Sequence, residues 1–242
     1  MSSLGVGGVL SRSFAIWLKN FPAFAVISLF MLSPYLLYTL AVMGGEPDAD
    51  SLQNLSWVSN LSFLFEQLAA GTVAYGVFEH LRGARAGVSE CISVGLRRAL
   101  PVILVAAVVG VCIGLGLVAL LIPGLVLWCA FSVAAPAAVV EMPGVQGAMA
   151  RSWQLTKGHR LHIFGVLFLL WLVEAAVGYL VLVTLVPDEG ATLDDLRSYV
   201  YLILPFEVAW VALNGVARAV IYHDLRVIKE GVATEELARV FE

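Results

Sequence analysis

Long stretches without any charged residue constrain the fold of this 242-residue chain more than any other feature. No Asp, Glu, Lys or Arg occurs between Lys19 and Glu46, and none occurs between Arg98 and Glu141. About 20 consecutive, mostly apolar residues suffice for one helix to cross the hydrocarbon core of a bilayer. The first stretch therefore predicts one transmembrane helix, and the second is long enough for two. Hydrophobic residues make up 60% of the sequence and charged residues only 13%, which is more apolar than a soluble domain.

The whole sequence predicts an all-α, polytopic membrane protein with six transmembrane helices. The Pro-Gly turn signal in Ile122-Pro123-Gly124 divides the second uncharged stretch. Three further apolar stretches each carry a glutamate in their interior. The six predicted helices are 22–43, 57–79, 100–121, 125–140, 161–186 and 199–221.

Lysine and arginine lie almost entirely on one side of these helices. The loops 44–56, 122–124 and 187–198 carry several acids but a single basic residue, Arg197. Loops that stay in the cytoplasm are enriched in Lys and Arg. We therefore expect a multi-pass protein of the bacterial cytoplasmic (inner) membrane with both ends of the chain in the cytoplasm.

Three segments that are too polar to span a membrane each begin with Gly-Val and precede a pair of predicted transmembrane helices. In each, large apolar residues stand one, five and nine positions after the glycine, on one face of a helix. These residues are Val6, Leu10 and Phe14; Val88, Ile92 and Leu96; and Val145, Met149 and Trp153. We expect three amphipathic helices that lie in the inner membrane interface; the alternative is a set of helical linkers.

The sequence thus predicts a single membrane domain, 1–242, built from three repeats of an amphipathic helix plus a helical hairpin. The repeat units are approximately 5–82, 87–141 and 144–226, and an amphipathic C-terminal tail follows at 231–242.

Three glutamates, Glu66, Glu174 and Glu207, lie within predicted transmembrane helices. At a rise of 1.5 Å per residue, all three fall at a similar depth in the outer half of the membrane. A charge at this depth costs roughly 3 kcal/mol or more, and such residues by default mark a site or a pathway. No basic residue is expected at their depth. They form the candidate polar site, for a solute, a proton or a lipid head group; the alternative is neutral carboxyls that hydrogen-bond between helices.

Five charged residues are candidates for the cytoplasmic interface: Arg12, Arg151, Arg218, Asp224 and Arg226. Arg218, late in the last predicted helix, is expected to extend its long side chain to this interface. The alternatives for Arg218 are pairing with Glu79, with Glu141 or with a lipid phosphate.

No motif of an enzyme occurs, and the extramembrane segments are too short for a soluble catalytic domain. His159 and His162 lack a third ligand, and Cys91, Cys112 and Cys129 are scattered, so neither set indicates a metal site or a disulfide framework. We therefore expect no enzymatic activity, no cofactor and no metal. A formal net charge of −4 gives no sign of nucleic-acid binding.

Three motifs stand out: Ile122-Pro123-Gly124; the run from Glu141 that contains Ala148-Met149-Ala150-Arg151-Ser152-Trp153-Gln154-Leu155-Thr156-Lys157-Gly158; and Tyr222-His223-Asp224-Leu225-Arg226 followed by Lys229-Glu230-Gly231. With these motifs the chain resembles the membrane-domain family attached to some glycerophosphodiester phosphodiesterases, and its stand-alone bacterial relatives of uncharacterised function. In the fused members the hydrolase is a separate soluble barrel. The resemblance therefore implies the membrane module without phosphodiesterase activity.

The leading functional hypothesis is a non-enzymatic inner-membrane protein in membrane or envelope lipid homeostasis, with membrane lipids as its partners. The second is a small transporter or channel that binds a cation or proton at the three glutamates. The third is a structural subunit of a larger membrane complex, with another membrane protein or a second copy of the chain as its partner.

Overall fold

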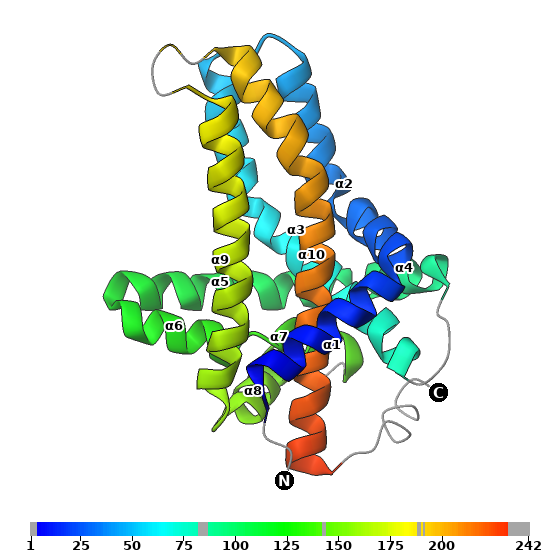
Figure 1. Cartoon of the computed structure of the whole chain (residues 1–242). Helices are drawn as coiled ribbons and strands as arrows, with labels where there is room; N and C mark the ends of the chain where they lie inside the picture. Colours follow the sequence, from blue (N-terminus) through cyan, green and yellow to red (C-terminus); the bar gives the residue numbers. More distant parts are fainter. Residues whose placement is uncertain (1–3, 82–86, 142–143, 188–189, 191, 232–242) are drawn as a thin grey trace.

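The computed structural model describes residues 4–81, 87–141, 144–187, 190 and 192–231. These residues form ten α-helices (Figure 1). The helices are α1 (Val6–Lys19), α2 (Phe21–Gly44), α3 (Ala49–Leu81), α4 (Val88–Arg97), α5 (Ala99–Ala119), α6 (Leu121–Ala130), α7 (Ala134–Val140), α8 (Gly144–Thr156), α9 (Arg160–Leu185) and α10 (Leu193–Glu230). All but the first residue of the predicted tail 231–242 lies outside the described residues.

The prediction of an all-α chain with six helices able to span a membrane is confirmed. Among the described residues, the helical stretches that are long and apolar enough are α2, α3, α5, α6 together with α7, α9 and α10. Helices α3 and α10 extend beyond the predicted 57–79 and 199–221 at both ends. At the start of α10 a local cap favours the helix, because Thr192 and Asp195 form a capping box there.

The end of α2 and the start of α10 lie together at one end of the molecule (Figure 1). There Arg197, the single basic residue of the predicted outer loops, donates from Nε to the carbonyl oxygen of Met43 at 2.8 Å and also donates to the carbonyl of Gly45. These carbonyls end α2, where a basic side chain is favourable. Arg197 thus joins the start of α10 to the end of α2.

The turn between α5 and α6 lies at Leu120, so the predicted turn at Ile122-Pro123-Gly124 is wrong. Leu120 is extended, with φ −162° and ψ 142°, and Pro123 lies in the first turn of α6. Proline fits there because the first N–H groups of a helix have no helical acceptor. Gly124 is needed for close packing, since a Cβ at this position would lie 2.7 Å from the backbone nitrogen of Leu117 in α5.

The α5–α6 hairpin lies crosswise to α9 and to the upper part of α10 (Figure 1). It leaves many large apolar side chains exposed along its length, among them Leu100, Val111, Leu115, Val118 and Ile122. If α9 and α10 cross a flat bilayer, α5 and α6 therefore lie inside it with their axes roughly parallel to the membrane plane. The second hairpin also differs in direction from the other two, and the threefold repeat stays a prediction.

Each of the three Gly-Val segments forms a helix, α1, α4 or α8, that packs on the long helices through small residues. All three bury the fourth and eighth positions after the first glycine: Val9 and Ser13, Cys91 and Gly95, Ala148 and Ser152. Helix α8 buries Leu155 and Thr156 as well. The predicted large apolar residues flank this contact, the first two of each segment half-buried and the third exposed. Small contact residues let helices approach closely; a Cβ on Gly95 would lie 2.2 Å from Oγ1 of Thr72 in α3.

The core lies where the second half of α3 packs against α10 and α2. The buried residues of α3 include Val73, Val77 and Phe78. Gly215 of α10 permits the close approach, because a Cβ there would lie 3.1 Å from Cα of Ala70. This packing brings the polar residues of α3 and α10 together.

Candidate functional site

A small polar pocket lies between α3, α9 and α10, and we name it the arginine pocket. Its polar lining residues are Glu66, Glu174, Asn214 and Arg218, and its volume is about 190 Å³. The aromatic side chains of Phe63, Trp128, Trp171 and Trp210 complete its wall. Two predicted site glutamates and one predicted interface arginine therefore share a single pocket.

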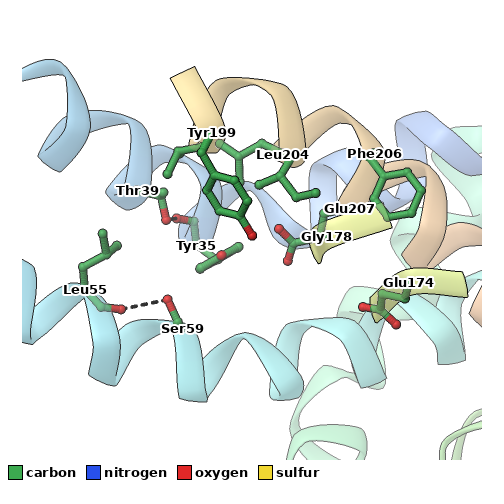
Figure 2. A pocket seen from close by; sticks show the side chains of 12 residues that line it. Tyr35, Thr39, Leu55, Ser59, Glu174, Gly178, Tyr199, Leu204, Phe206 and Glu207 are labelled. Atoms are coloured by element: carbon green, nitrogen blue, oxygen red, sulfur yellow. Dashed lines mark hydrogen bonds between the residues drawn. The ribbon is translucent and has the colours of Figure 1, made fainter. Parts of the chain in front are cut away.

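A second pocket, the glutamate pocket, lies between α2, α3, α9 and α10 (Figure 2). Glu174 and Glu207 line it, and its volume is about 380 Å³. The other polar lining residues are Tyr35, Thr39, Ser59 and Tyr199. Because Glu174 lines both pockets, the three predicted glutamates form one continuous set: Glu66 with Glu174, and Glu174 with Glu207.

Neutral hydrogen-bond donors hold two of the carboxyls. The indole Nε1 of Trp210 donates to Oε2 of Glu174 at 2.9 Å, and Oγ of Ser62 donates to Oε1 of Glu66 at 3.1 Å. Trp210 of α10 reaches Glu174 from a neighbouring helix, whereas Ser62 lies one turn before Glu66 in the same helix, α3. They orient the carboxyls without neutralising them.

The structure contradicts the expectation that no basic residue lies beside these acids. Arg218 is the basic residue that lies beside them. Its Nη1 donates to Oε1 of Gln67 in α3, and it lines the pocket of Glu66 and Glu174. The physical reason is the close packing of α10 on α3. Sequence-based depths are counted along each helix by itself, and such a count does not show which residues of two packed helices lie side by side.

An apolar groove continues from the arginine pocket. It lies between α3, α9 and the α5–α6 hairpin, has a volume of about 870 Å³, and is lined mainly by residues such as Ile113, Leu117, Leu121, Leu125, Phe164 and Phe168. Phe63, Trp128 and Trp171 line both the groove and the arginine pocket. A polar pocket and a hydrocarbon-lined groove are thus parts of one cleft.

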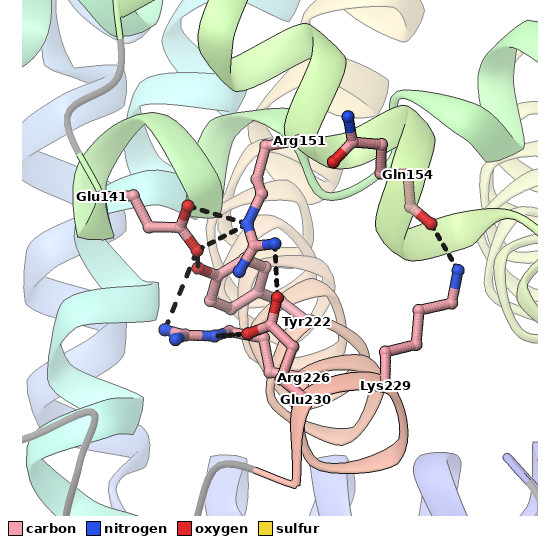
Figure 3. Close-up of polar contacts among 7 residues, drawn as sticks. All are labelled: Glu141, Arg151, Gln154, Tyr222, Arg226, Lys229 and Glu230. Atoms are coloured by element: carbon pink, nitrogen blue, oxygen red, sulfur yellow. Dashed lines mark hydrogen bonds and ion pairs between the residues drawn. The ribbon is translucent and has the colours of Figure 1, made fainter.

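The other candidate interface residues form ion pairs within the protein. Arg151 of α8 donates from Nε to Glu141 at 2.8 Å and also pairs with Glu230 (Figure 3). The hydroxyl of Tyr222 donates to the same Glu141 at 2.5 Å, and Nε of Arg226 donates to Glu230 at 3.0 Å. Burial alone would lower the pKa of Arg151, but its hydrogen bonds to Glu230 and Glu141 raise that pKa above its ordinary value.

Arg12 of α1 pairs with Asp224 of α10. Nη1 of Arg226 lies 3.8 Å from Oε1 of Glu141, which follows α7. Four of the five candidate interface residues therefore pair with residues outside their own helix, which leaves Arg218 as the one in the cleft. The second and third sequence motifs meet in this network, through Glu141 and Arg151 on one side and Tyr222, Arg226 and Glu230 on the other. Sequence reasoning did not identify Gln67, Trp210 and Asn214 as site residues, because no local pattern marks them.

In the part of the chain that the structure describes, no three His, Cys, Asp or Glu side chains are grouped so as to hold a metal ion. Comparison of the chain with protein-family models, curated proteins and solved structures finds no match.

Proposed function

We propose that the chain is a non-enzymatic, multi-pass protein of the bacterial cytoplasmic membrane that serves membrane or envelope lipid homeostasis by holding a lipid in the cleft between α3, α9 and α10. One observation carries the proposal: the arginine pocket and the apolar groove share Phe63, Trp128 and Trp171. A lipid has the same two parts, a polar head and an apolar tail. The cleft offers each part a matching surface.

The cleft is also open on the side from which a lipid would arrive. Helix α9 is mostly unburied along its length, and Trp171, which lines both parts of the cleft, is 53% exposed. Within a bilayer these surfaces face hydrocarbon. An acyl chain can therefore enter the groove without first crossing water.

One further feature supports a membrane location with both ends in the cytoplasm. The end of α2 and the start of α10, next to which the acids Glu46, Asp48, Asp194 and Asp195 stand in the sequence, lie at the end of the molecule opposite to α8 and the end of α10 (Figure 1). Loops retained in the cytoplasm are the basic ones. The resemblance to the membrane module of glycerophosphodiester phosphodiesterases fits a lipid-related role.

The experiment is native mass spectrometry of the full chain purified in lipid nanodiscs. Gly114 lines the groove and Gly178 lines the glutamate pocket, and a Cβ on either meets no atom within 4 Å. Gly114→Leu should fill the groove and lower the retained lipid, whereas the matched Gly178→Leu should leave it at the wild-type level. Undiminished lipid on the folded Gly114→Leu variant would refute the proposal.

A second candidate function, a transporter or channel for a cation or proton, is favoured by the position of Glu174 in both pockets. Carboxyls from three helices then follow one another along the cleft, as in intramembrane proton relays. Proteoliposomes with a pH-sensitive or cation-sensitive dye test it. A flux that Glu174→Gln and Gly178→Leu abolish would favour transport, and no flux in the wild type would exclude it for the ion tested.

A further inference from the structure

The charged groups of the arginine pocket specify the head group that the cleft can accept. Arg218 contributes one guanidinium, and Glu66 and Glu174 contribute two carboxyls. Each has a neutral hydrogen-bond partner: Gln67 for Arg218, Ser62 for Glu66 and Trp210 for Glu174. Within the described residues, none of the three forms an ion pair.

Opposite charges that line one pocket without touching leave room for a ligand between them. Charges removed from water are costly unless an opposite charge compensates them. The pocket between these charges has a volume of about 190 Å³. This space suits a small polar group that carries charges of both signs.

We propose that the arginine pocket binds the head group of a zwitterionic amine phospholipid. The phosphate accepts hydrogen bonds from the guanidinium of Arg218, and the ammonium group donates to Glu66 and Glu174. The acyl chains lie in the apolar groove beside Gly114. This inference rests on the lipid-holding function proposed above and names the class of lipid.

The chemistry of the wall fits each part of this head group. A guanidinium matches phosphate oxygens in a planar, two-pronged geometry. An ammonium is attracted both by carboxylates and by the faces of indole rings, and Trp128, Trp171 and Trp210 line the pocket.

The same charges disfavour simpler ligands. An anionic phospholipid without an amine places its phosphate near two carboxyls that it cannot neutralise. A cationic amphiphile without a phosphate leaves Arg218 uncompensated. Only a head group with both charges satisfies the guanidinium and the carboxyls together.

The experiment offers the full chain equal amounts of phosphatidylethanolamine and phosphatidylglycerol with identical acyl chains and counts the retained lipids by native mass spectrometry. The wild type should retain the amine lipid roughly tenfold more than the anionic lipid, the factor expected for one charge-assisted contact. Glu66→Gln and Glu174→Gln should each shift this ratio toward phosphatidylglycerol. Arg218→Gln should lower the retention of both phospholipids, and Arg218→Lys, which keeps the charge, should restore part of it.

The outcomes separate this inference from the function on which it rests. If Gly114→Leu retains as much lipid as the wild type, the lipid-holding function itself fails. If Gly114→Leu loses the lipid but the glutamate variants keep the wild-type ratio, the function stands and the head-group assignment is wrong. A wild type without preference between the two probes also overturns the assignment. Size-exclusion profiles and melting temperatures identify folded variants, and only these are compared.

Discussion

The indole Nε1 of Trp210 donates a 2.9 Å hydrogen bond to the carboxyl of Glu174 and so joins α10 to α9 at the place where two pockets meet. Glu174 is the residue that both pockets share. The bond therefore sets the position of the carboxyl on which either function, lipid binding or ion transport, depends.

Glu174→Gln should leave the melting temperature close to that of the wild type, because the amide oxygen of glutamine still accepts the indole N–H. Trp210→Phe removes the donor and should lower stability by roughly 1–2 kcal/mol. Thermal unfolding in one detergent measures both. Trp57→Phe, at a position that is 66% exposed, is the control for the loss of an indole. A Glu174→Gln variant as unstable as Trp210→Phe would show that the charge, not the hydrogen bond, holds the helices.

Gly95→Ala should destabilise the contact between α4 and α3, since the new Cβ would lie 2.2 Å from Oγ1 of Thr72. Overpacking of this kind costs about 1–3 kcal/mol. Gly7→Ala, where a Cβ meets no atom within 4 Å, should not lower the melting temperature. Thr72→Ala combined with Gly95→Ala should recover part of the loss, and additive effects of the two changes would argue against a direct clash.

The crosswise α5–α6 hairpin predicts an unusual labelling pattern in intact cells. In a background without Cys91, Cys112 and Cys129, a membrane-impermeant maleimide should label Glu46→Cys and Asp194→Cys from outside. Leu120→Cys, at the turn of the hairpin, should stay unlabelled because the hairpin lies within the bilayer.

Lys157→Cys is the control for the inner side and should react only after the membrane is permeabilised. Labelling of Leu120→Cys from outside would show that α5 and α6 cross the membrane upright. In that case the direction of the hairpin in the membrane would differ from the structure.

Glu141→Gln should lower stability by about 2–4 kcal/mol, because the neutral amide cannot compensate the charges of Arg151 and Arg226 and accepts fewer hydrogen bonds from Arg151. Tyr222→Phe removes a single bond to Glu141 and should cost less. Melting temperatures measure the difference. Asp194→Asn is the control, since that carboxyl is 86% exposed and exposed pairs contribute little. Equal effects of Glu141→Gln and Asp194→Asn would refute a stabilising network.

Cys91 of α4 should resist alkylation in the folded protein. Its side chain is buried, and burial raises the pKa of the thiol to about 11. The thiolate is the reactive form, so at pH 8 the folded chain should react slowly with N-ethylmaleimide and the denatured chain rapidly. Peptide mass spectrometry gives the two rates, and rapid reaction in the folded chain would place Cys91 in a more open environment than the structure shows.

The sequence by itself determined the helices and their ability to span a membrane. That information is local: an uncharged stretch of sufficient length must satisfy its backbone hydrogen bonds internally in hydrocarbon, and a helix does so. The sequence also singled out Glu66, Glu174 and Glu207 as residues whose position inside apolar, membrane-spanning stretches needs an explanation. It placed one turn wrongly, at Ile122-Pro123-Gly124, because a Pro-Gly pair fits the first turn of a helix as well as a loop.

Only the tertiary structure decided which residues meet. Arg218 faces Glu66 and Glu174 because α10 packs closely on α3 at Gly215, and the α5–α6 hairpin lies crosswise because its contacts with α3 and α9 set its direction. Small residues such as Ser13, Gly95 and Ser152 form the buried contacts of α1, α4 and α8. None of these arrangements has a local signal, since the free energy of each comes from packing between side chains far apart in the sequence.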